Sequence, residues 1–67
     1  MPGRSIRKQL IEQTRQAIDH LDRLDYILAD MKVRAGDRQP AIDEFGPILV
    51  EGHEQLRRLW QGLRSRL

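Results

Sequence analysis

The sequence predicts an all-α fold, an antiparallel helical hairpin that dimerises into a four-helix bundle. Three observations support this prediction. From Ser5 to Ala35 there is neither glycine nor proline, and good helix formers dominate. In both halves of the chain, apolar residues recur in alternating steps of three and four, which is the spacing of a helical seam. Finally, a chain of 67 residues without cysteine buries little surface by itself, which favours association with a second copy.

The first helix is predicted over about residues 5–35. It ends where Gly36 follows the last periodic residue, because glycine readily adopts the left-handed conformation that closes a helix. Residues 36–39 form a short polar turn. The connection is so short that the second helix must run antiparallel to the first.

The second helix is predicted over about residues 40–66, with Pro40 in its first turn, where proline is favoured. Gly46 and Pro47 interrupt it, since proline removes a backbone donor and crowds the preceding turn. Two outcomes are open: one kinked helix, or a single turn followed by a longer helix that starts at Pro47. The apolar spacing keeps its phase across the interruption, which favours a kink or brief break.

One apolar seam is predicted to hold the hairpin and the dimer together. Its members are Leu21, Leu24, Leu28, Met31, Leu49, Leu56, Leu59 and Leu63. Further apolar residues lie beside the seam and widen it into a face, which suits a bundle better than a two-stranded coiled coil.

The charges are distributed unevenly along the chain. The net charge is only +2, but nine of the ten acidic residues lie in the middle of the chain and towards the turn. Antiparallel packing therefore predicts one basic tip, which would contact nucleic-acid phosphates in an alternative function. The residues for that contact are Arg4, Arg7, Lys8, Arg57, Arg58, Arg64 and Arg66. The other interpretation is a solubilising surface.

Three further side chains are candidates for binding. Trp60 would serve as an anchor for a partner protein or as part of the core or dimer interface. His20 and His53 each have acidic neighbours and are predicted at similar heights in the hairpin, so a metal-binding bundle is a second alternative. Against it, the Glu-x-x-His spacing of di-iron bundles is absent, and the two histidines flank opposite sides of the seam.

The sequence offers no catalytic constellation. There is no cysteine nucleophile, Ser5 and Ser65 have no nearby histidine, and no glycine-rich phosphate loop exists. We therefore expect a non-enzymatic interaction or regulatory module without a cofactor, which is a homo-oligomeric scaffold or adaptor for another protein. The longest aliphatic run is residues 48–50, which excludes a membrane span, and no secretory signal follows Met1, so a cytoplasmic location is expected.

Overall fold

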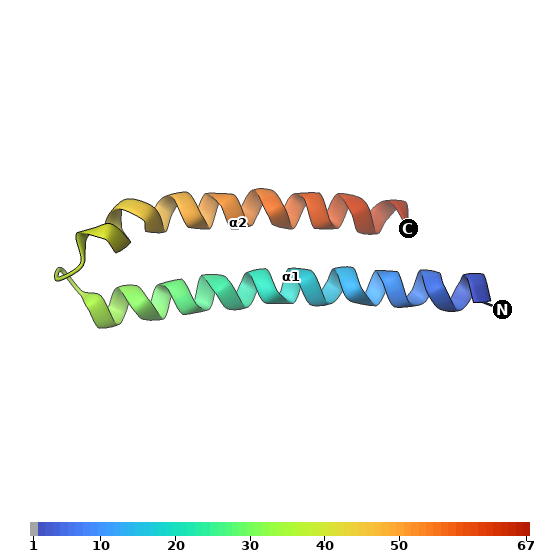
Figure 1. Cartoon of the computed structure of the whole chain (residues 1–67). Coiled ribbons are helices and arrows are strands. Elements are labelled where there is room, and N and C mark those ends of the chain that lie inside the picture. Colours follow the sequence, from blue (N-terminus) through green and yellow to red (C-terminus); the bar gives the residue numbers. More distant parts are fainter. Residues whose placement is uncertain (1) are drawn as a thin grey trace.

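The fold is a hairpin of two long helices. The computed structural model describes the backbone of residues 2–67 and the side chains from Ile6 onward. Helix α1 comprises Pro2–Ala35 and helix α2 comprises Pro40–Arg66. The two helices lie side by side and antiparallel (Figure 1), in a rod of 56 × 18 × 10 Å. The predicted all-helical hairpin is confirmed.

The two ends of α1 follow from local chemistry. The helix begins at Pro2, earlier than the sequence predicts, and proline is tolerated there because the first turn needs no backbone donor. At the other end Gly36 has a φ of 56°, the left-handed conformation expected of it. The Gly36 N–H donates to the Lys32 carbonyl at 3.0 Å, which closes the last turn.

Helix α2 is continuous through Pro47, which is the first of the two outcomes that the sequence allows. Figure 1 shows its first turn tilted away from the axis of the rest of the helix. Pro47 explains the tilt, because its ring has no N–H to donate and displaces the carbonyl one turn earlier. The kink therefore carries the start of α2 away from the line of the hairpin.

The register of the hairpin is fixed by a contact between His53 of α2 and Asp25 of α1. The sequence instead predicts His53 at a height similar to that of His20, which lies five residues before Asp25 on α1. Counting outward from the observed pair brings Leu67 level with Ile11, and both are partly buried. The start of α1 therefore projects beyond the end of α2, as Figure 1 shows.

The hairpin has a thin core. Among the described side chains only Leu21, at 5% exposure, and Thr14, at 2%, are fully buried. The accessible surface is 5867 Å², whereas a compact monomer of 7.9 kDa has about 4,400 Å². A single hairpin thus leaves roughly 1,500 Å² more surface in water than a compact fold of this mass does.

Candidate interaction surface

The contact between the helices is a seam that combines apolar and charged residues. On α1 the least exposed positions follow the alternating three–four spacing of a helix pair. They are Ile11, Thr14, Ile18, Leu21, Asp25, Leu28 and Ala35, together with Ala17 beside them. The Thr14 hydroxyl donates to the Ile11 carbonyl at 2.6 Å, so its burial leaves no unpaired polar atom. On the α2 side the less exposed positions are Ile42, Gly46, Gly52, His53, Arg57 and Leu67, and Trp60 lies beside them.

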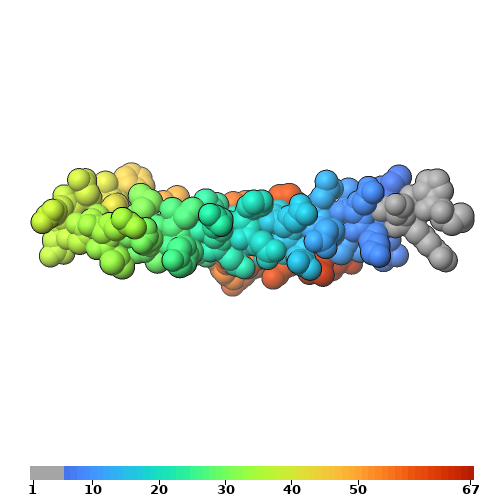
Figure 2. Space-filling view, turned by 90° about the horizontal axis from the view of Figure 1, so that it is seen from below, coloured from blue at the N-terminus to red at the C-terminus, as the bar shows by residue number. Residues whose placement is uncertain are grey.

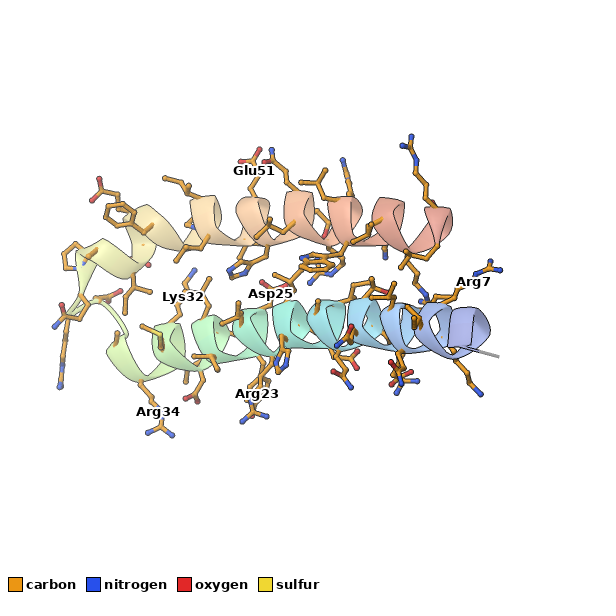
Figure 3. The ribbon with its side chains drawn as sticks, turned by 45° about the vertical axis from the view of Figure 1, so that its right-hand side comes forward. Arg7, Arg23, Asp25, Lys32, Arg34 and Glu51 are labelled. Carbon is orange, nitrogen blue, oxygen red and sulfur yellow. The ribbon has the colours of Figure 1, made fainter. Side chains whose placement is uncertain are left out.

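At the middle of this seam Asp25 joins the two helices through hydrogen bonds. Figure 3 shows Asp25 directed towards α2. Its Oδ1 lies 2.6 Å from Nδ1 of His53, whose side chain is only 13% exposed. A carboxylate accepts only, so Nδ1 carries the proton and donates. Oδ2 of Asp25 accepts from Nη2 of Arg57 at 2.9 Å.

Arg57 bridges three carboxylates from both helices. Besides Asp25, it donates through Nη2 to Asp22 at 2.8 Å and through Nη1 to Glu54 at 2.6 Å. Asp22 and Glu54 each follow a seam residue by one position, so they mark one side of the hairpin. We call this side, defined by Asp22, Glu54 and Arg57, the ionic edge.

The network shifts two pKa values. Hydrogen bonds from His53 and then from Arg57 lower the pKa of Asp25 below its ordinary value of 3.8, against a smaller opposing effect of burial. The hydrogen bond to Asp25 is also the main reason that the pKa of Arg57 is raised. Both shifts stabilise the ionised pair, so the charges at this point of the seam are satisfied within one chain.

The other side of the hairpin is apolar and uncovered. Leu24 of α1 and Leu56 of α2 each precede a seam position by one residue, and Met31 and Leu49 lie seven residues from them on the same helix faces. Two antiparallel helices are related by a local twofold axis perpendicular to their common plane, so equivalent positions lie on the same side of the pair. We call the resulting strip the apolar face. It comprises Leu10, Ala17, Leu24 and Met31 of α1 and Leu49, Leu56 and Leu63 of α2.

The exposed fractions show that the described side chains leave the apolar face partly open to solvent. Its six large members are each between 41% and 47% exposed. The single seam that the sequence predicts is therefore divided in the structure. Leu21 and Leu28 lie between the helices, Leu59 is 69% exposed, and the remaining five lie on the apolar face.

Trp60 lies at the border between the seam and the apolar face. It is 36% exposed and lines a shallow hollow of about 290 Å³ together with Leu56, Leu59 and Leu63. The indole is therefore partly packed within the hairpin and partly available to a partner. The same position suits either interpretation drawn from the sequence, an anchor or an interface residue.

The structure distributes the predicted phosphate contacts over two environments. Arg57 belongs to the ionic edge and is only 17% exposed, and Arg58 lies 3.7 Å from Glu54. Figure 3 shows Arg7 at the end of α1 that projects beyond α2. The open end of the hairpin comprises residues 6–18 and 58–67. Within it, basic residues are Arg7, Lys8, Arg15, Arg58, Arg64 and Arg66, and the only acidic residue is Glu12. Arg4 lies outside the described side chains.

The register of the hairpin gives the two histidines different surroundings. His53 is committed to Asp25, whereas His20 is exposed on α1. Among the side chains from residue 6 onward, no three histidine or acidic residues are grouped as metal ligands. A metal site therefore finds no support in the geometry.

The Asp25 network is the feature that the sequence analysis missed. The signal was present, because Ile11, Ile18, Asp25 and Lys32 repeat every seven residues, one position beyond the leucines of the predicted seam. Figure 3 shows that Lys32, like Asp25, points towards α2, whereas Arg23 points away from it. Because Asp25 and Lys32 are polar, this track is less apolar than the leucine track that the sequence predicts as the seam.

Comparison with known proteins gives no relative: no family model, curated protein or solved structure matches the chain. Within residues 2–67, neither helix is sufficiently long and apolar to cross a membrane.

Proposed function

We propose that this protein is a non-enzymatic interaction module that self-associates through its apolar face and acts as a scaffold or adaptor. The observation that carries the proposal is the uncovered strip of six large apolar side chains, each 41–47% exposed. Contiguous apolar strips of this kind mark interaction sites in soluble proteins. They are rarely left in water, because burying a leucine fully contributes about 1.5–3 kcal/mol.

The area of exposed surface agrees with this proposal. A standard protein interface buries about 800 Å² on each partner. The excess of roughly 1,500 Å² over a compact fold leaves enough surface for such an interface. Two hairpins packed through their apolar faces would form a four-helix bundle, with the ionic edge of each hairpin outside it.

The test is sedimentation equilibrium over a dilution series, with circular dichroism to report folding. The native chain should sediment as a dimer or larger species. Leu24→Glu/Leu56→Glu places a carboxylate on each helix of the apolar face and should abolish association. The matched control is Tyr26→Glu/Val33→Glu, whose positions are 75% and 81% exposed and lie off that face, so association should persist. A native 7.9 kDa species that melts cooperatively would overturn the proposal.

The open end favours a second candidate function, contact with nucleic-acid phosphates. Four of its basic residues form none of the ion pairs found among the described side chains, namely Arg7, Lys8, Arg64 and Arg66. The open end as a whole contains six basic residues and one acidic residue. Binding of this kind would weaken steeply with salt, because each neutralised phosphate releases counterions. Association through the apolar face would persist at the same salt concentrations.

A further inference from the structure

This inference rests on the proposed function and specifies what covers the apolar face. We propose that the occupant is a second copy in head-to-tail orientation, related by a twofold axis that passes beside Leu56. The open end of each hairpin then lies over the turn end of the other. The proposal depends on three features: the charge distribution, the position of the apolar face along the rod, and the pairing of the seam charges within each hairpin.

The charge distribution selects head-to-tail orientation. The open end carries six basic residues and one acidic residue. The turn end, residues 26–52, carries five acidic residues (Asp30, Asp37, Asp43, Glu44 and Glu51) against three basic ones (Lys32, Arg34 and Arg38). Head-to-tail packing brings ends of unlike charge together, whereas head-to-head packing would bring two strongly basic ends together. Screening limits the effect to about 10 Å, which is within reach of hairpins in direct contact.

The position of the apolar face fixes the axis. Leu56 lies midway between Leu49 and Leu63 on α2. The register of the hairpin brings Leu56 level with the part of α1 between Leu21 and Leu24, near the middle of the apolar positions of α1. An axis beside Leu56 therefore overlaps the two faces most completely. It places Leu56 against its own copy and Leu49 against Leu63 of the other copy.

The polar surroundings allow this arrangement. The charged side chains inside the seam are paired within their own hairpin, at Asp25, His53 and Arg57. The ionic edge faces away from the apolar face, so docking buries no unpaired member of the network. Figure 2, seen from the side of α1, shows a slender rod in which α2 lies behind α1.

Cysteine crosslinking tests the orientation, and the native chain contains no cysteine. The variants are Leu49→Cys, Leu56→Cys and Leu63→Cys, with Tyr26→Cys as a control of similar chemistry off the face. Each is oxidised alone by dissolved oxygen, and Leu49→Cys and Leu63→Cys are also unfolded together, refolded and oxidised. Crosslinked dimers are measured on non-reducing gels, and the mass before oxidation is measured by sedimentation.

Head-to-tail docking predicts that Leu56→Cys crosslinks alone and that Leu49→Cys and Leu63→Cys crosslink only with each other, because a disulfide needs Cα atoms within about 7 Å. In a head-to-head dimer the twofold axis would run along the rod and lay α2 of one copy over α1 of the other, so none of these α2 pairs would come within that distance. If dimers sediment but these variants crosslink no faster than Tyr26→Cys, the head-to-tail arrangement is wrong, while self-association stands. If all variants and the native chain sediment as monomers, the proposed function fails as well.

Discussion

Replacement of Asp25 by asparagine should destabilise the protein near neutral pH and leave it almost unaffected in acid. Asp25→Asn keeps the size of the side chain but removes its charge. The amide oxygen of the asparagine still accepts one hydrogen bond. Its N–H₂ group replaces the other carboxylate oxygen and would meet a donor at the place where that oxygen accepts. One of the two bonds, from His53 at 2.6 Å or from Arg57 at 2.9 Å, is therefore lost.

The expected loss follows from the environment of Asp25. A hydrogen bond to a charged group contributes about 1.5–3 kcal/mol when it is buried. The Asp25 side chain is 32% exposed, so water replaces part of the lost bond and we expect a loss of about 1 kcal/mol, or roughly fivefold in the unfolding equilibrium.

The pH dependence identifies the cause. The pKa of Asp25 is lowered in the folded state, so its contribution is complete above the unfolded value near 3.8 and is lost as the pH falls through the folded pKa. Below that pH the native side chain is also neutral, and the two proteins should have nearly equal stability. Asp25→Asn has no such titration.

The assay is urea unfolding of both proteins at one chain concentration, near pH 7 and at about pH 2.5. The stability difference should be clear at the higher pH and should shrink at the lower. Equal differences at both values, or greater stability of Asp25→Asn near neutrality, would refute the assignment of the network as a stabilising contact between the helices.

Three further predictions concern the seam, the kink and the open end. Leu28→Asp places a second carboxylate one turn from Asp25 and should unfold the protein outright, so a helical monomer by circular dichroism and sedimentation would contradict it. Pro47→Ala restores a backbone donor within α2 and should raise the melting temperature measured by circular dichroism, so an unchanged or lower value would contradict it. If the open end binds phosphates, Arg7→Gln/Lys8→Gln should flatten the salt dependence of DNA affinity by a slope of about two, measured by fluorescence anisotropy.

Local sequence determined where α1 ends and where α2 begins. The stretch from Ser5 to Ala35 contains neither glycine nor proline, which favours a helix, and Gly36 ends it with a positive φ that other residues adopt only with strain. The short turn made the helices antiparallel. These features depend on neighbouring residues alone, which is why they could be predicted without a tertiary structure.

Tertiary structure decided which face of each helix meets the other. Two tracks, one residue apart, both have helical spacing on α1, and the more apolar one contains Leu24 and Met31. The structure turns the other track inward, because Asp25 finds its partners His53 and Arg57 28 and 32 residues away. The spacing along α1 does not reveal that Asp25 has partners so distant in the sequence. Their pairing directs the leucine-rich track outward and so creates the apolar face.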